Sequence, residues 1–519
     1  MDIIKFCDWL MSIDWLNTTT SERLKAFAIV LTLLGSVSFT VKFAAQCINL
    51  RAFRGPLALP LIGNCYLKEA LFLMRYLSQL RKKYGKHFTF FAFTKPYIVV
   101  CDPISVRRIL SDSKVFIKGT DYTETFAVAF GKGLVTSNGE QHRKDRSKFN
   151  KLFVKTSVAK HMKMINRVTT ELIDEMLQPD GELAKSTKGE TNANGVVFNI
   201  EHYFAVLSLR VFCNFALGQG LGREKEEWLA GVVSHGSFAV GRMITLGLPM
   251  WDIFPATGTI KSSRKSLWEL LKVLVDERKK NPLPEGEDGD CLSVMIEENM
   301  TDQEMNDHLV TLLSAGHDTT AYFSAYCMYL LSTHQEVQDK LRGEIAARMK
   351  GRSEVTADDV TEMKYLNCVM QETLRLYAII SNVSRHCTTT THIKENGVTF
   401  PAGCDVLIPM FLINRDPELW EEPSKFRPER FEGSTGFFTN AKNGYFPFGY
   451  GSRTCIGNTL SQMESAVFIC HLLMKYEVNE DVGFKPTIFS GISLTTSNGI
   501  NVRLKEKQTT AGILSFLTK

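Results

Sequence analysis

The sequence lacks paired metal-binding cysteines and a strong excess of charge. Its twelve cysteines are scattered along the chain with no C-x-x-C pair, which argues against a zinc site and against a disulfide framework. The net charge is only +5, so no nucleic-acid partner is expected. The remaining composition is that of an ordinary globular protein, since 44% of the 519 residues are hydrophobic and 23% are charged.

An uncharged run of residues lies near the N-terminus. Residues 26–41 carry no charge, and residues 43–47 extend the run beyond Lys42. A membrane span needs about 20 apolar residues, so we predict a retained transmembrane anchor, with the side chain of Lys42 reaching toward an interface. A cleaved signal peptide is the alternative, but the run begins late and its leader carries four acidic residues.

The segment after this run is basic and then rich in proline and glycine. Lys42, Arg51 and Arg54 are followed by no acidic residue until Glu69, which favours a cytosolic position for the rest of the chain. The sequence RGPLALPLIGN, residues 54–64, predicts a stiff, non-helical hinge. The predicted divisions are an N-terminal segment (1–25), the transmembrane anchor (26–47), a proline-rich hinge (48–64) and one catalytic domain (65–519).

Ten residues near the C-terminal end carry the strongest chemical signal. Residues 448–457 read FGYGSRTCIG and are followed by a predicted helix. Cys455 lies just ahead of that helix, whose positive end favours a thiolate over a thiol. Gly457 and two further glycines let a large flat ligand come close, Phe448 supplies an aromatic wall, and Arg453 supplies donors suited to a carboxylate. The loop therefore predicts an anionic sulfur ligand for the metal of a planar cofactor that carries acid groups.

This loop resembles the cysteine-ligand loop of the cytochrome P450 family, whose pattern is F-x-x-G-x-x-x-C-x-G. Phe448, Gly451, Cys455 and Gly457 match the pattern, and Arg453 matches the family's frequent haem-propionate arginine. The resemblance implies haem b (iron protoporphyrin IX) with the Cys455 thiolate as axial ligand. It also implies a mainly α fold with a minor β region, the cytochrome P450 fold, here with an N-terminal transmembrane helix.

A basic stretch, residues 139–153, is predicted to be helical and resembles the family's W-R-x-x-R helix. Arg143 and Arg146 are in place, and His142 stands where tryptophan is usual. By the resemblance, Arg146 pairs with a haem propionate and His142 can donate a hydrogen bond to the other. Arg385 is a weaker candidate for a further propionate contact.

A long buried helix is predicted from a capping box at residues 301–304 to about Thr333. In its middle lies the sequence AGHDTT, which matches the family's A-G-x-D-T-T signature and includes Gly316. A Thr319 hydroxyl that bonds back to the helix can open a groove for water, and Asp318 can relay protons. The resemblance makes these two residues the catalytic pair.

Three charged residues are expected to form a buried ion triad. Glu372 and Arg375 lie at i, i+3 on one predicted helix face, and the segment PERF contains Arg430. By the resemblance, this triad fixes the cysteine-loop side of the core. Ala378 departs from the family, which often has proline just after this helix.

Other segments give weaker predictions. Residues 88–101 read as strands and residues 484–504 as a hairpin, whose tip at 488–493 faces the substrate by family analogy. Residues 235–258 read as a mobile, apolar entry segment, and residues 277–290 as a polar loop.

The resemblance implies a haem-thiolate monooxygenase that inserts one oxygen atom of dioxygen into an apolar substrate such as a sterol, fatty acid, terpenoid or xenobiotic. Electrons come from NADPH-cytochrome P450 reductase, with cytochrome b5 as an optional second donor. The expected location is the endoplasmic reticulum membrane, with a single span and a cytosolic catalytic domain.

Two alternative functions stay open. One is a haem-thiolate isomerase or dehydratase without an electron donor, which the intact Asp-Thr pair disfavours. The other is a haem sensor or carrier without turnover.

Overall fold

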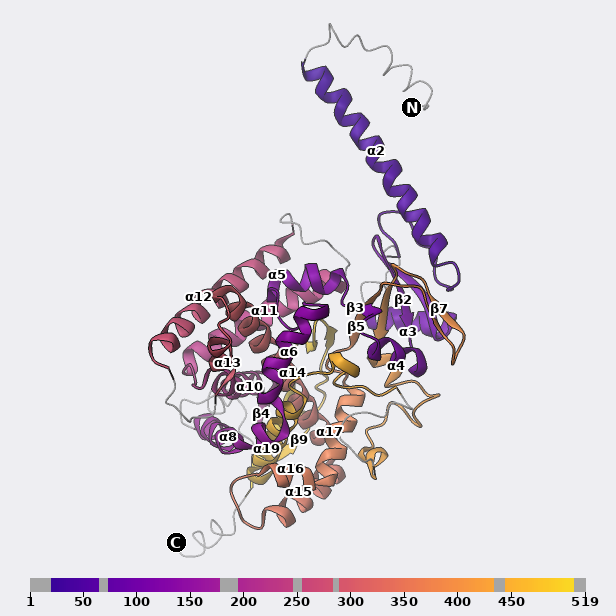
Figure 1. The fold of residues 1–519 in the computed structure, drawn as a ribbon. Helices are drawn as coiled ribbons and strands as arrows, with labels where there is room; N and C mark the ends of the chain where they lie inside the picture. The colour runs from indigo at the N-terminus through magenta and orange to yellow at the C-terminus, as the bar shows by residue number, and fades with distance from the viewer. Residues whose placement is uncertain are drawn as a thin grey trace, which may run out of the picture.

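The computed structural model describes residues 20–64, 73–177, 195–245, 254–282, 289–433 and 444–507. Helices dominate these residues, and the largest sheet lies at one side of the helical body (Figure 1). The predicted class, mainly α with a minor β region, is therefore confirmed.

The helices are α2 (Thr20–Asn49), α3 (Leu73–Tyr84), α4 (Pro103–Ser111), η2 (Asp121–Phe126), α5 (Ala127–Phe130), α6 (Gly139–Phe153), α7 (Lys155–Lys160), α8 (Met162–Leu177), α10 (Ile200–Leu217), α11 (Arg223–Thr245), α12 (Pro255–Lys280), α13 (Cys291–Glu297), α14 (Asp302–Thr333), α15 (Gln335–Met349), α16 (Ala357–Glu362), α17 (Lys364–Leu376), α18 (Met410–Ile413), η3 (Pro428–Phe431), η5 (Gly451–Arg453) and α19 (Asn458–Lys475). The strands are β1 (His87–Ala92), β2 (Lys95–Val100), β3 (Phe116–Ile117), β4 (Val196–Asn199), β5 (Asn382–Cys387), β6 (Thr391–Ile393), β7 (Val398–Phe400), β8 (Asp405–Pro409), β9 (Tyr476–Asn479), β10 (Ile488–Ser490), β11 (Leu494–Thr496) and β12 (Asn501–Glu506).

The strands form one larger sheet and several small ones. The five-stranded sheet has the order β1-β2-β8-β5-β3, in which β2 and β8 are parallel and the other pairs antiparallel. The predicted strands at 88–101 are confirmed as β1 and β2. The predicted hairpin at 484–504 is confirmed for β10 and β11, whereas residues 501–504 belong to β12, which pairs with β4 and β9 in a separate sheet.

Helix α14 runs through the body because its sequence is apolar and well capped. The Thr301 hydroxyl accepts a hydrogen bond from Glu304 N (3.3 Å), and the Glu304 carboxylate accepts one from Thr301 N (2.8 Å). These two hydrogen bonds form the predicted capping box. A cap of this kind contributes about 1 kcal/mol to the stability of the fold. Most side chains of α14 are buried, as expected for a helix in the interior.

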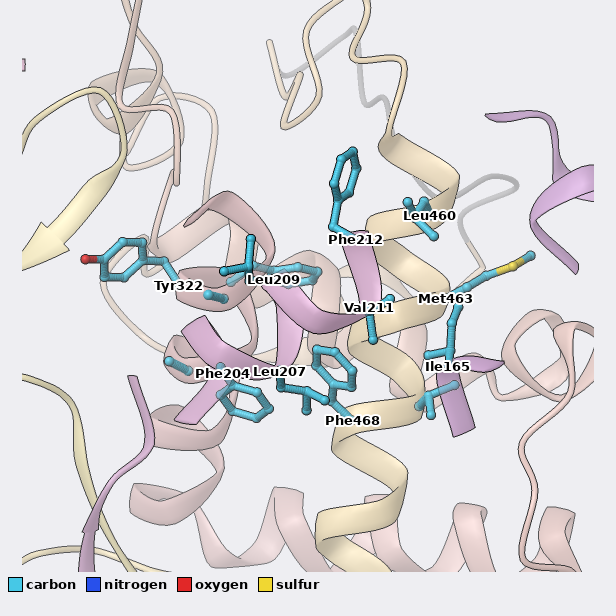
Figure 2. Close-up of a cluster of buried hydrophobic side chains, with 14 of the residues drawn as sticks. Ile165, Phe204, Leu207, Leu209, Val211, Phe212, Tyr322, Leu460, Met463 and Phe468 are labelled. Atoms are coloured by element: carbon cyan, nitrogen blue, oxygen red, sulfur yellow. The ribbon is translucent and has the colours of Figure 1, made fainter. Parts of the chain in front are cut away.

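The main core lies where α8, α10, α14 and α19 meet. Figure 2 shows Phe204 and Leu207 of α10 beside Phe468 of α19, with Ile165 of α8 close by. The rings of Phe204 and Phe468 stack with centroids 5.7 Å apart. This packing fixes the helix that follows the cysteine loop against the rest of the body.

Helix α2 differs from the body helices because its large apolar side chains face outward. It extends away from the body (Figure 1), and Phe27, Leu34 and Val41 are each about 60% exposed (60%, 62% and 62%). At its C-terminal end Phe43 is buried, with its ring centroid 5.6 Å from that of Phe91 in β1. Among the helices described in full, α10 is the one long and apolar enough to cross a membrane, and 78% of it is buried inside the body.

Two predicted irregular segments are partly helical. Residues 235–245 of the predicted entry segment continue α11, where Ala239, Val240 and Met243 are buried at helical spacing. The mobility of this segment stays a prediction. The predicted polar loop at 277–290 is wrong for residues 277–280, which complete α12. Residues 246–253 and 283–288 lie outside the described residues.

Candidate active site

The cysteine loop is a tight turn held by its own backbone. Cys455 N donates to Phe448 O (2.8 Å), and Thr454 N donates to Gly451 O (3.1 Å). Gly457 occupies the N-cap of α19, and a Cβ added there would lie 4.0 Å from Cys455 Sγ. The turn therefore presents the sulfur beside a bare stretch of backbone.

The side chain of Cys455 is exposed, yet the surrounding protein desolvates its thiol. This burial raises the pKa of Cys455, while a hydrogen bond from Gly457 N and the charge of Arg146 act in the opposite direction. The expected preference of Cys455 for the thiolate form stays a prediction for the metal-bound protein, because a bound metal cation deprotonates a coordinating thiol.

The middle of α14 is less buried than the rest of the helix. Ala315 is exposed and Gly316 and Thr319 are half-buried in an otherwise buried stretch. Thr319 Oγ1 donates to Ala315 O (2.8 Å), the back-bonded arrangement that loosens a helix locally. On the opposite side, Thr320 Oγ1 donates to Ser461 Oγ (3.1 Å) and ties α14 to α19.

Gly316 is required by packing between helices. A Cβ added at this position would lie 2.3 Å from the ring of Phe212 in α10, so the glycine lets α10 and α14 approach closely. Its predicted contact with a cofactor stays a prediction.

Basic side chains gather beside the cysteine loop. In the part of the chain that the structure describes, none of them has a carboxylate within ion-pair distance, and the charges acting on them come mainly from one another. Burial, followed by these charges, lowers the pKa of Arg453 to about 10 and that of Lys118 well below its usual value. Arg453 Nη1 is buried without a hydrogen-bond partner within the described ranges. The members of this basic cluster are Lys118, His142, Arg146, Arg385 and Arg453.

Two members of the basic cluster come from helix α6, as the sequence predicts. Arg146 Nη1 donates to Thr454 O (2.5 Å) and so holds the residue next to Cys455. His142 is buried, and burial together with Arg453, Arg146 and Lys118 lowers its pKa to about 3. The imidazole is therefore neutral and has one N–H to donate.

Asn138 organises the remaining members. Arg453 Nη2 donates to Ser137 O (2.9 Å) and to Asn138 Oδ1 (3.1 Å). The same amide accepts from Lys118 N (3.0 Å) and donates to Lys118 O (2.8 Å). Lys118 could not be predicted from the sequence, because it lies in the short segment between β3 and η2 and has no motif around it.

The three predicted triad residues are in contact. Arg375 donates to Glu372 through Nε and Nη2 (both 2.7 Å), and Arg430 Nε donates to Glu372 Oε1 (3.0 Å). Glu372 and Arg375 are fully buried and Arg430 nearly so. Arg375 also donates to the carbonyl oxygens of Asn414 and Pro423. The triad therefore joins α17 to the segment that leads into the cysteine loop.

An apolar hollow lies between the larger sheet and the helices. It encloses about 620 Å³ of space, part of it open to solvent, and is lined mainly by apolar side chains. Phe90, Phe126 and Leu407 belong to this lining, and Asp121 and Asn382 add polar groups. Gly491 and Ile492 of the C-terminal hairpin also line it, although Cys455 and Thr319 do not.

A family model described as Cytochrome P450 matches residues 53–502 of the chain. The chain belongs to the cytochrome P450 family. It is similar to Cytochrome P450 3A9 of Rattus norvegicus, with 27% identity over 447 residues, 81% of this chain and 84% of that protein. It is also similar to Cytochrome P450 3A5 of Homo sapiens, with 26% identity over 458 residues, 83% of this chain and 85% of that protein.

Membership of the cytochrome P450 family settles the class of cofactor and reaction. Cytochromes P450 are monooxygenases whose haem iron is bound by a cysteine thiolate, and this chain is such an enzyme. Its residues fit the cofactor: buried basic groups without acidic partners suit two propionates, and Arg453 Nη1 offers an unused donor. The Cys455 side chain is exposed and that of Thr319 is half-buried, so both remain accessible to a bound group.

Proposed function

We propose that this cytochrome P450 inserts one atom of dioxygen into an apolar substrate, with Cys455 as the iron ligand and Thr319 and Asp318 as the proton-delivering pair. The observation that carries this proposal is the basic cluster beside the cysteine loop, whose members lack acidic partners in the described structure. A cluster of this kind is costly unless an anionic group neutralises it.

The chain's own residues would hold the haem in defined ways. Arg146 and His142 would each contact a propionate, with Lys118, Arg385 and Arg453 as further donors to these groups. Arg146 would also keep the cysteine loop in shape through Thr454 O. The bound haem supplies dioxygen activation at its iron, which the thiolate assists. The protein's part is to orient the substrate, exclude water and deliver protons.

Proton delivery would use the open middle of α14. The Thr319 hydroxyl can accept or donate a proton at Oγ1, and the buried carboxyl of Asp318 can hold one beside it. Because Thr319 Oγ1 already bonds to Ala315 O, water can enter the loosened turn and connect the two side chains.

The substrate would be apolar, because the hollow beside the sheet is lined mainly by apolar side chains. Ser490, Gly491 and Ile492 are part of the lining, which supports the expectation that the hairpin tip at 488–493 faces the substrate. Candidate classes are sterols, fatty acids, terpenoids and xenobiotics.

The outward-facing apolar side chains of α2 support a membrane anchor. We propose the anchor at residues 26–47, the hinge at 48–64 and the catalytic domain at 65–519, with the domain in the cytosol at the endoplasmic reticulum. Electrons would come from NADPH-cytochrome P450 reductase, with cytochrome b5 as an optional second donor.

The experiment that tests the catalytic pair compares Thr319→Ala with Thr319→Ser. A general acid–base contribution is typically about 10²–10⁴-fold, so Thr319→Ala should bind substrate normally but turn NADPH consumption into peroxide release. Thr319→Ser keeps the hydroxyl and should restore product. Unchanged coupling of NADPH use to product in Thr319→Ala would contradict the proposed role.

A further inference from the structure

The carboxylate of Asp318 is held from outside its own helix. Ser234 Oγ, on α11, donates to Asp318 Oδ1 (3.0 Å), and Asp318 is only 5% exposed. Within the described ranges, this is the one side-chain hydrogen bond that the carboxylate makes. A buried carboxylate needs such donors, so its position depends on α11.

Among the described residues, no permanently charged cation pairs with Asp318 in place of the hydrogen bond from Ser234. His317 Nδ1 lies 3.3 Å from Asp318 Oδ1, but neither ring nitrogen has a hydrogen-bond partner within the described structure. Burial lowers the pKa of His317, so the ring is neutral. The other nearby titratable groups are Glu201 and Tyr322. Burial is the main cause that raises the pKa of both groups, and the charge of Asp318 is a smaller one. Tyr322 Oη donates to Glu201 Oε1 (3.3 Å).

The same face of α11 also touches the substrate hollow. Gly241 lies two turns after Ser234, and a Cβ added to it would lie 2.5 Å from the Cα of Gly491, a residue that lines the hollow. Residues seven apart share a helix face. The ring of Phe238 lies 5.1 Å from that of Phe489 in the same hairpin. Helix α11 therefore contacts the hairpin tip and Asp318 at once.

We propose that Ser234 is a positioning residue that holds the Asp318 carboxyl in place for proton delivery, and that α11 thereby links occupancy of the substrate hollow to that delivery. This inference rests on the proposed role of Asp318 and Thr319. The step it controls is a proton transfer alone. The Asp318 carboxyl gives its proton to the water and hydroxyl chain at Thr319 and takes one back from solvent, with no change of electrons.

The test uses Ser234→Ala, the conservative Ser234→Thr and the matched control Ser237→Ala, a buried serine one turn further along α11. Ser234→Ala should raise peroxide release per NADPH by about tenfold, less than the 10²–10⁴-fold expected for loss of the acid itself. Ser234→Thr keeps the hydroxyl donor and should restore coupling. Ser237→Ala should behave as the parent enzyme.

A second readout needs no turnover. Infrared difference spectra of the ferric enzyme, with the Asp318 band assigned through Asp318→Asn, report the hydrogen bonding of this carboxyl group. Because Ser234→Ala removes the hydrogen bond that Ser234 Oγ donates to Asp318 Oδ1, it should shift the stretching band of Asp318, and Ser234→Thr should reverse the change.

The outcomes separate this inference from the proposed function. If Asp318→Asn uncouples the enzyme while Ser234→Ala matches the parent in coupling and in the position of the Asp318 infrared band, the positioning role fails and the proposed function stands. If Asp318→Asn leaves coupling unchanged, the proposed proton pathway fails and takes the inference with it. If Ser234→Thr behaves like Ser234→Ala, the residue acts through packing and the inference is overturned.

Discussion

At the scale of single residues, the cysteine loop depends on backbone conformations that only glycine adopts readily. Gly451 has φ +74°, and a Cβ there would lie 2.7 Å from Leu110 O at the end of α4. A side chain in the left-handed region costs about 1–2 kcal/mol, and here a clash with backbone is added. The loop therefore seats against α4 only because the side chain is absent.

We expect Gly451→Ala to lower the thermal unfolding temperature and the haem content of the purified enzyme. Gly433→Ala is the matched control, because Gly433 has the same φ of +74° but open space where the Cβ would lie. Both variants carry the conformational cost, and only Gly451→Ala carries the clash. Equal losses in the two variants would show that contact with Leu110 does not shape the loop.

The sequence allowed prediction of residues whose role follows from local chemistry, and it failed where a role depends on neighbours from distant segments. Cys455 and Arg453 could be named because the loop around them is specific. Lys118 could not, since its proximity to Arg385 and Arg453 comes from the fold. The effect of burial on the pKa of Cys455 could not be predicted either, because burial is a property of the folded chain.

At the scale of helices and strands, the ion triad joins α17 to the segment before the cysteine loop. Among the described residues, Glu372 is the one carboxylate that pairs with Arg375 and Arg430, and it also accepts a hydrogen bond from Arg427 N (3.0 Å). Its removal leaves two buried cations facing each other. Breaking a buried pair in this way costs about 3–5 kcal/mol.

We therefore expect Glu372→Gln to be destabilised by about 3–5 kcal/mol in urea unfolding. Glu429→Gln serves as the control, because Glu429 pairs with the half-exposed Lys340 at 3.0 Å, and an exposed pair contributes only about 0–1 kcal/mol. A similar small effect of both substitutions would mean that the triad does not hold these segments together.

Helix boundaries were predicted best where the sequence carries its own signals. The capping box marked the start of α14, and α6 has the predicted bounds of residues 139–153. The contact of α11 with the hairpin tip could not be predicted, because it joins segments far apart in the chain and depends on two glycines, Gly241 and Gly491. The stacked rings of Tyr326 and Tyr377, 4.1 Å apart, likewise join α14 to the end of α17 without any sequence signal.

At the scale of the whole molecule, the surface around α6 is the proposed docking site for an acidic reductase. Several of its basic groups lie near acids: Lys148 Nζ is 3.5 Å from Glu298, and Arg143 is 2.5 Å from Glu140. Lys144 is exposed and makes no ion pair within the described structure.

We expect Lys144→Glu to slow reduction of the enzyme by the reductase, most strongly at low ionic strength, because charge steering of association is screened by salt. Peroxide-supported turnover, which needs no partner, should stay normal. Lys265→Glu on α12 is the control, since Lys265 is 78% exposed but belongs to another helix. If both variants are reduced at the parent rate, the reductase docks elsewhere.

The most direct test of the account is the absorption spectrum of the reduced carbon monoxide complex in Cys455→Ala. The long-wavelength band of that complex depends on a thiolate ligand, so it should disappear in Cys455→Ala. Cys470→Ala, which removes a fully buried cysteine of α19, should keep the band. Persistence of the band in folded, haem-containing Cys455→Ala would contradict the assignment of Cys455 as the iron ligand.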